Sequence, residues 1–257
     1  MHLGELVLLF LLCLIAIGAN FLSAFSGGGA GLVQLPALIL LGLPFSKALA
    51  THKLASVALG IGASIRHSQE KDFSKFYTTL ILGCGLPGVF IGSNIILFIP
   101  NEVSTLALGI LTLLLGIFSS KRTSKQEKEC KKKFNTFKVF CGGFVIFIIG
   151  MINGSITSGT GLFVTLWLVN WFGLSYTKAI AYTLVLVGIF WNGAGALILG
   201  TNGEVQWNWL PTLILGSLIG GYLGAHFSLI KSERIVKRAF EIIALSMGVS
   251  LIAKGVL

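Results

Sequence analysis

Long apolar stretches recur along the whole chain, and they restrict its fold to one broad class. Eight of them approach or exceed the roughly 18 residues that indicate a membrane-spanning helix. They are Leu3–Phe25, Ala48–Ile65, Phe76–Ile99, Ser104–Phe118, Val139–Ile152, Ala179–Leu199, Trp209–Ile230 and Ile235–Ala253. Charged residues make up only 11% of the chain, against about 25% in soluble domains. The pattern predicts an all-α, polytopic integral membrane protein without a soluble domain.

Two shorter apolar segments, Leu32–Leu43 and Leu162–Phe172, each follow a glycine-rich run. The runs are GGGAG (27–31) and SGTG (158–161). A helix of about 12 residues rises about 18 Å, well short of the roughly 30 Å of hydrocarbon in a bilayer. Non-helical backbone is tolerated at that depth only where protein or a water-filled cavity surrounds it. We therefore expect two broken helices whose glycine loops lie within the membrane.

The two glycine runs belong to a repeat that covers the chain. Ser46–Ala48 matches Thr177–Ala179, and GGGAG (27–31) matches TSGTG (157–161). The offset between matching positions stays near 130 to 133 residues, about half the chain. Each half then contains five apolar segments, and an odd number inserts the halves in opposite orientations.

The expected architecture is therefore an inverted repeat of two five-segment halves, with about eight full spans and two short segments. The predicted divisions are a first transmembrane repeat at 1–119, a basic linker at 120–137 and a second transmembrane repeat at 138–257.

The net charge of +10 is distributed as membrane topology requires. Sixteen of the 19 Lys and Arg residues lie in four loops, at 66–75, 119–138, 173–178 and 231–238. This asymmetry predicts a multi-pass protein of the cell membrane, with the linker cytoplasmic and both termini outside. Anionic membrane lipids are natural partners of the linker. Nucleic acid is not expected, because no aromatic stacking platform accompanies the basic run. Whether the chain forms a homo-oligomer stays open.

The glycine loops have the chemistry of an anion site. Glycine lets backbone N–H groups approach a ligand closely, and a helix that begins there presents free N–H groups and a positive dipole. Two such ends related by inverted symmetry suit an anion near the bilayer midplane. Close helix packing is the alternative reason for small residues in a membrane. The predicted substrate-binding residues are Gly28, Gly29, Gly31, Thr51, Lys53, Ser158, Gly159, Thr160, Gly161 and Thr183.

Two ionisable residues stand inside a predicted span, in the run ATHKLAS (50–56). An ionisable group within a membrane suggests function by default. Lys53 would neutralise an anionic substrate, unless it extends to the outer interface instead. His52 would carry a coupling proton, unless its role is structural. In the second half the matching positions keep a hydroxyl at Thr183 but have no charge.

Two long segments resemble the signatures of a known transporter family. SGGGAGLVQLPALILLGLPFSKALATHKLASVALG (26–60) and NGSITSGTGLFVTLWLVNWFGLSYTKAIAYTLVL (153–186) are similar to the first and second halves of the TauE/SafE family. Close members of that family often have a lysine where this chain has Leu184. The resemblance implies an integral membrane permease, often for small organosulfur anions such as sulfite or sulfonates.

The leading functional hypothesis is a secondary transporter of a small anion. It would work by alternating access, as the halves 1–119 and 138–257 rock against each other. A passive channel for a small solute is the alternative. An intramembrane enzyme is not expected, because GSITSG (154–159) lacks the spacing of a membrane serine protease. No cofactor or metal is expected either, since the spans hold no carboxylate pair or histidine cluster and the four cysteines have no metal-ligand spacing.

Overall fold

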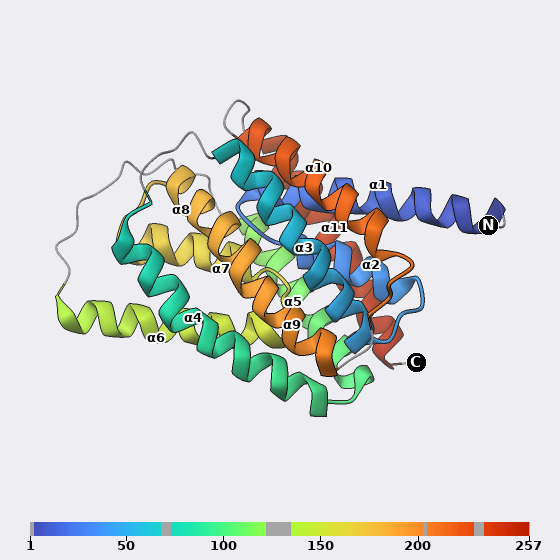
Figure 1. Ribbon diagram of the computed structural model, residues 1–257, viewed down its shortest axis with the longest axis horizontal. Helices are drawn as coiled ribbons and strands as arrows, with labels where there is room; N and C mark the ends of the chain where they lie inside the picture. The colour runs from blue at the N-terminus through green and yellow to red at the C-terminus, as the bar shows by residue number, and fades with distance from the viewer. Residues whose placement is uncertain (1–2, 68–72, 122–134, 203–204, 229–233, 257) are drawn as a thin grey trace.

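The computed structural model describes residues 3–67, 73–121, 135–202, 205–228 and 234–256, and in these ranges the chain is helical with no strands (Figure 1). Most of the predicted basic linker, residues 122–134, lies outside the described residues. The first half contains α1 (Leu3–Ser26), η1 (Ala30–Leu32), α2 (Gln34–Leu40), α3 (Phe45–His67), α4 (Lys75–Ile95), η2 (Ile96–Phe98) and α5 (Asn101–Lys121). The second half contains α6 (Thr136–Ser155), α7 (Thr160–Trp167), η3 (Leu168–Phe172), α8 (Tyr176–Tyr182), η4 (Thr183–Trp191), α9 (Asn192–Asn202), α10 (Leu210–Ser228) and α11 (Arg234–Val256).

The helices confirm the prediction of a polytopic all-α membrane protein. Within the described residues, six are long and apolar enough to cross a bilayer, namely Leu3–Ser26, Phe45–Arg66, Lys75–Phe98, Thr136–Ser155, Tyr176–Asn202 and Leu210–Ser228. The other two predicted spans fall in α5 and α11, helices of 21 and 23 residues. Their described apolar parts are Asn101–Leu115 and Leu245–Gly255.

Both predicted helix breaks are present. The first helix, α1, ends at Ser26, and the three glycines that follow have φ angles of 89°, 117° and 131°. In the second half, α6 ends at Ser155, and Thr157 and Gly159 have φ angles of 64° and 67° before α7 begins. A positive φ angle ends a right-handed helix, which needs negative φ angles. Glycine suits such positions, because L-residues rarely adopt a positive φ. Thr157 is the exception, and nothing in the sequence indicated a positive φ at a β-branched residue.

Equivalent helices of the two halves pack against each other in opposite directions. Along α5 and α11, Leu106 lies against Gly255, whereas Leu113 lies against Gly248. Along α3 and the second-half helix η4–α9, Lys53 lies against Gly195, whereas Gly60 lies against Gly188. Residue numbers therefore rise along one helix and fall along its equivalent. This antiparallel packing is what an inverted repeat requires.

Two other helix pairs join the halves side by side. The first-half helix α1 runs along α10, and the second-half helix α6 runs along α4 (Figure 1). Glycines permit both approaches: a Cβ on Gly220 would lie 2.4 Å from the Ile17 carbonyl oxygen, and one on Gly92 would lie 2.0 Å from that of Met151. Each pair takes one helix from each half, so 1–119 and 138–257 share two long helix contacts. The rocking of these halves against each other stays a prediction.

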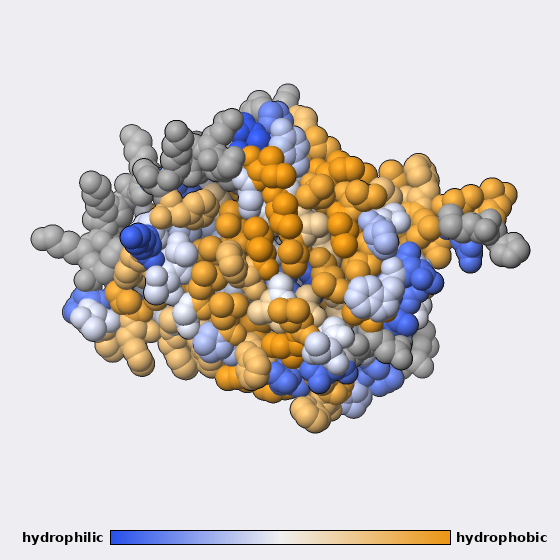
Figure 2. All heavy atoms as spheres, viewed as in Figure 1, coloured by the Kyte–Doolittle hydropathy of each residue, from blue (hydrophilic) through white to orange (hydrophobic). Residues whose placement is uncertain are grey.

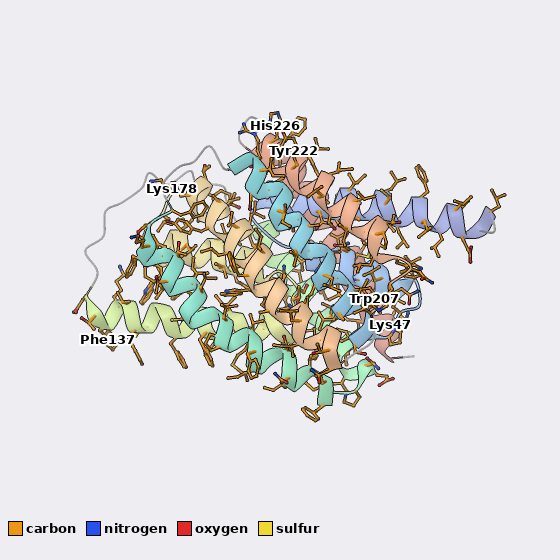
Figure 3. All side chains as sticks on the ribbon, viewed as in Figure 1. Lys47, Phe137, Lys178, Trp207, Tyr222 and His226 are labelled. Carbon is orange, nitrogen blue, oxygen red and sulfur yellow. The ribbon has the colours of Figure 1, made fainter. Side chains whose placement is uncertain are left out.

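The outer surface suits contact with lipid. Figure 2 shows hydrophobic residues covering the middle of the face in view, with hydrophilic residues gathered toward the ends of the helices. Large apolar side chains are exposed on the protein surface, among them Phe90 and Leu197. Lys47 and Trp207 lie at one end of the bundle, and Lys178 and Phe137 lie at the opposite end (Figure 3). Polar and aromatic residues at both ends are typical of the two interfaces of a membrane protein.

The close approach of α1 and α10 generates a test of the packing. Gly220→Ala places a methyl group against the Ile17 carbonyl, and overpacking of this kind costs roughly 1–3 kcal/mol. We expect a lower thermal unfolding midpoint for the purified protein in detergent. Gly18→Ala is the control on the same helix pair, because nothing lies within 4 Å of its Cβ position. Equal stability of the two variants would contradict the observed packing of α1 against α10.

Candidate functional site

The two glycine loops meet in the middle of the protein. A Cβ on Gly28 would lie 2.6 Å from the Gly161 carbonyl carbon, and a Cβ on Gly161 would lie 3.0 Å from the Gly28 Cα. Thr165 fixes this crossing, since its hydroxyl lies 2.7 Å from the Gly27 carbonyl oxygen and 2.9 Å from the Thr183 hydroxyl. The contact leaves no room for side chains, so glycine is required on both loops for a steric reason.

A small cavity of about 40 Å³ lies beside this crossing. Its wall combines parts of both halves: Ser23, Gly28, Gly29, Ala30, Gly31, His52, Ser56, Leu59, Asn153, Thr157, Thr160, Gly161, Thr183, Leu184, Val187, Gly188 and Asn192. Every one of these residues is buried except Gly161, which is half-buried. The cavity is therefore surrounded almost entirely by buried residues.

Seven of the residues singled out in the sequence line the cavity. They are Gly28, Gly29, Gly31, His52, Thr160, Gly161 and Thr183. The predicted backbone donors differ in their availability. The Gly28 N–H donates to the carbonyl of Ser23, in the last turn of α1, at 2.7 Å, whereas the Gly29 N–H has no acceptor in the described part of the chain. Gly29 therefore retains a free donor for a ligand.

Four other predicted residues lie outside the cavity wall: Thr51, Lys53, Ser158 and Gly159. Thr51 accepts a hydrogen bond from the Gln206 backbone N–H at 2.9 Å. The Ser158 hydroxyl lies 3.0 Å from that of Thr112. Gly159 caps α7 with a left-handed conformation and faces Leu115. In this structure these three residues contact other segments of the protein, and their role as substrate contacts stays a prediction.

Lys53 does not extend to the outer interface, because its side chain is fully buried. Its Nζ donates to the backbone oxygen of Asn153 at 2.8 Å and to the Asn153 Oδ1 at 3.2 Å. The stem of the lysine passes over Gly195, where a Cβ would lie 2.9 Å from Cδ. Gly195, on α9, thus leaves space for the Lys53 side chain, which extends from α3 and binds Asn153 on α6.

Asn153 connects this buried charge to the cavity. Its Nδ2 donates to the Thr160 hydroxyl at 2.8 Å, and that hydroxyl donates to the Thr157 carbonyl oxygen at 2.8 Å. Both Thr160 and Asn153 line the cavity, so the lysine lies one residue behind its wall. Leu184 lines the same wall and is the position equivalent to Lys53 in the second half. The positive charge is therefore on one side of the cavity only.

Two cavity residues outside the predicted set of substrate-binding residues have unsatisfied polar atoms. In the described part of the chain the Ser23 Oγ and the Asn192 Oδ1 have no hydrogen-bond partner, and their residues are 1% and 6% exposed. Buried polar atoms are normally paired, so each such atom calls for an explanation. Asn192 follows the π-helical segment η4, which begins at Thr183, and departures from α-helical geometry often occur at functional sites. The polar residue in an apolar run was the available signal for Asn192.

His52 lies in a buried hydrogen-bond network. Its Nδ1 is 3.1 Å from the Gln34 Oε1, and its Nε2 is 3.2 Å from the Ser56 hydroxyl. Gln34 is bound in turn to Asn20, at 3.2 Å, and to Ser217, at 3.4 Å. Among the described residues, no group of three His, Cys, Asp or Glu side chains is placed to hold a metal ion. The site offers neutral donors and acceptors together with one buried cation.

Comparison with known proteins gives a consistent family. The family model described as sulfite exporter TauE/SafE matches residues 12–251. A probable membrane transporter protein of Haemophilus influenzae is 27% identical over 252 residues, covering 98% of this chain and 97% of the relative.

The probable membrane transporter protein YfcA of Escherichia coli K12 is 26% identical, with 96% and 90% covered. YdhB of Bacillus subtilis, also named a probable membrane transporter protein, is 22% identical, with 91% and 94% covered. These names fit a protein that is not an enzyme. No solved structure matches the chain.

The contact between Lys53 and Asn153 generates a stability test. Asn153→Leu removes a partner of a buried ammonium group, and a hydrogen bond to a charged group contributes about 1.5–3 kcal/mol. We expect a lower unfolding midpoint in detergent, and a smaller drop when the same change is made in a Lys53→Met background. Asn202→Leu, at an exposed asparagine of α9, is the control. Equal drops in both backgrounds would show that Asn153 does not stabilise the lysine.

Proposed function

The chain belongs to the sulfite exporter TauE/SafE family of membrane transporters, and on this premise we propose that it is a secondary transporter of a small anion. The observation that carries the proposal is the buried cavity beside the crossing of the two glycine loops. Binding sites of inverted-repeat transporters lie where interrupted helices of the two repeats meet. We place the substrate in this cavity, and we propose no catalytic step.

The unsatisfied atoms of the cavity support a ligand there. The Ser23 hydroxyl and the Gly29 N–H are free to donate to an anion, and neither has a partner in the described part of the chain. Leaving a buried polar group unpaired costs roughly 1–3 kcal/mol. A bound oxyanion would pair these donors, together with the Thr183 hydroxyl in the same wall. The empty site would thus be less stable than the occupied one.

Charge favours an anion over a neutral or cationic solute. The cavity wall contains no carboxylate, and the fully buried Lys53 has only Asn153 as its hydrogen-bond partner in the described structure. A charge in a low-dielectric interior is stabilised by a nearby charge of opposite sign. In this proposal Lys53 acts on the substrate through Asn153 and Thr160, without direct contact in the observed conformation.

Cavity size narrows the substrate class. A volume of 40 Å³ holds about three water-sized groups, since each needs roughly 10–15 Å³. A compact oxyanion fits this space, and a long carbon chain does not. The description of the family model names a sulfite exporter. We therefore propose sulfite or a short sulfonate as the substrate class of this chain.

Alternating access requires the cavity to open to each side in turn. We propose that contacts between the halves close it at both ends. At one end the Tyr176 hydroxyl donates to the Ser26 carbonyl at 2.7 Å. At the other end Thr51 holds the backbone of Gln206. Because α1 packs along α10 and α4 packs along α6, we propose that the moving bodies contain helices of both halves.

The distribution of positive charge supports an orientation in the membrane. We propose that the chain lies in the cell membrane with the linker 120–137 cytoplasmic and both termini outside. Lys178 and Lys47 lie at opposite ends of the bundle, with Lys178 at the proposed cytoplasmic end (Figure 3). Anionic lipids would meet the basic loops on that side.

Substitution at the loop crossing tests the site. Gly28→Ala forces a methyl group into the Gly161 backbone at a φ of 117°. A distortion of roughly 1–3 kcal/mol in the transport cycle corresponds to about a 5- to 150-fold loss of labelled sulfite uptake into proteoliposomes. Gly42→Ala is the matched control, because it also has a positive φ, of 103°, but nothing lies within 4 Å. Normal uptake by well-inserted Gly28→Ala protein would exclude the crossing as the site.

Ligand-induced stabilisation tests the substrate class. A ligand at 100 times its Kd raises the free energy of unfolding by about 2.7 kcal/mol. We expect sulfite or a short sulfonate to raise the unfolding midpoint of the purified protein, and chloride and a carboxylate to raise it less. The rise is expected to shrink in Asn192→Leu, which replaces a polar cavity residue by an apolar one. Equal shifts with all anions would contradict a sulfur oxyanion site, and uptake without saturation would favour a channel.

A further inference from the structure

His52 is the titratable side chain of the cavity wall, and both of its ring nitrogens have hydrogen-bond partners. It lies on α3 and is fully buried. The Gln34 Oε1 lies 3.1 Å from Nδ1, and the Ser56 hydroxyl lies 3.2 Å from Nε2. Ser56 also lines the cavity, so it stands between the imidazole and the space that a ligand would occupy.

The hydrogen-bond network determines which ring nitrogen carries the proton. The Gln34 Oε1 is an acceptor only, and it also receives the Asn20 Nδ2–H at 3.2 Å. The Gln34 Nε2 donates to Ser217, which holds the amide in this orientation. The His52 Nδ1 must therefore be the donor to Gln34. In the neutral ring the Nε2 lone pair is then free to accept the Ser56 O–H.

Resting on the proposed anion transport, we propose that His52 binds the proton that is co-transported with the anion. A proton entering the open cavity forms an N–H bond with the Nε2 lone pair. The ring then donates to the Ser56 oxygen, and the Ser56 O–H turns from the ring toward the cavity. There it donates to the bound anion. The proton site and the anion are thus linked by one chain of hydrogen bonds, in which the Ser56 hydroxyl reverses the direction of its donation.

Charge makes the two ligands depend on each other. The titratable neighbour of His52 in this region is Lys53, on the same helix. The described partners that face His52 from other elements are Gln34 on α2 and, behind it, Asn20 on α1 and Ser217 on α10, none of which titrates. A second buried positive charge beside Lys53 is unfavourable until an anion enters the cavity. Each ligand therefore raises the affinity for the other, as linkage requires.

Placement of His52 in the cavity wall makes a separate proton wire unnecessary. In alternating access the cavity faces each side in turn, so the imidazole exchanges protons with the same solution as the substrate. The equivalent position in the second half is Thr183, which also lines the cavity and cannot titrate. The cavity thus has one proton-binding group in its wall, His52, and we expect one proton to accompany each transported anion.

Flux in proteoliposomes tests the coupling with two probes, labelled sulfite and a labelled two-carbon sulfonate, whose sulfonate group stays ionised at physiological pH. The readout is the ratio of uptake with an inward proton gradient to uptake without one. For wild type we expect a ratio of roughly 10, within the usual range of coupling between two ligands. For His52→Gln, which retains hydrogen bonding but cannot accept a proton, we expect a ratio near 1, whatever its basal rate.

Two further variants make the test decisive. His226→Gln removes a histidine bound to Arg66 outside the cavity and is expected to keep the wild-type ratio. Ser56→Ala leaves the imidazole in place but removes the hydroxyl, and we expect a ratio reduced severalfold. If His52→Gln does not fold, the ratio measured for Ser56→Ala tests the proposal. A wild-type ratio in both His52→Gln and Ser56→Ala would overturn the proton site.

The failures of the two proposals are distinguishable. If wild type exchanges internal for external labelled anion but shows a ratio of 1, transport stands and proton coupling is wrong. If wild type shows neither uptake nor exchange with either probe, the proposed transport of sulfur oxyanions fails first, and the inference resting on it fails with it.

Discussion

The hydrocarbon of a bilayer offers no hydrogen-bond partner, and this constraint governs the whole structure. Backbone that leaves the helical path must be enclosed by protein. The two interrupted helices satisfy the requirement by placing their loops against each other, with Gly28 on the backbone of Gly161. Thr165 then pairs with the Gly27 carbonyl across the two halves. Each helix break would leave backbone polar groups unpaired in the membrane by itself, and the contact between the two loops encloses both breaks within the protein.

The same constraint applies to the buried polar side chains. Lys53 is held by Asn153, and His52 by Gln34 and Ser56, so that each buried ionisable group has defined partners. The pairing is incomplete only at a few atoms, two of which, on Ser23 and Asn192, belong to the cavity wall. The other two described unpaired atoms, on Asn20 and Ser104, lie outside the cavity wall. The two in the wall are the ones that a polar ligand in the cavity would pair.

Close helix packing provides the remaining framework. Most of the glycines outside the loops lie at helix contacts, as Gly88, Gly92 and Gly220 do, whereas Gly83 has open space around its Cβ position. Both kinds of glycine, those at helix contacts and those with open space, lie in similar apolar runs, so the sequence does not separate them. The pairs α1–α10 and α4–α6 also follow from packing, and each joins a helix of the first half to a helix of the second.

The sequence by itself determined the membrane class and the two helix breaks, because these depend on hydrophobic length and on local glycine conformation. It also indicated part of the candidate site, such as Gly29 and Thr183, since the loops and their symmetry are local patterns. Only the tertiary structure decided which hydroxyls face the cavity: Ser56 does, whereas Ser158 bonds to Thr112. The partner of Lys53, 100 residues away in the chain, was likewise beyond reach of the sequence. The physical reason is that such pairings depend on how distant helices cross, and spacing along one helix does not contain that information.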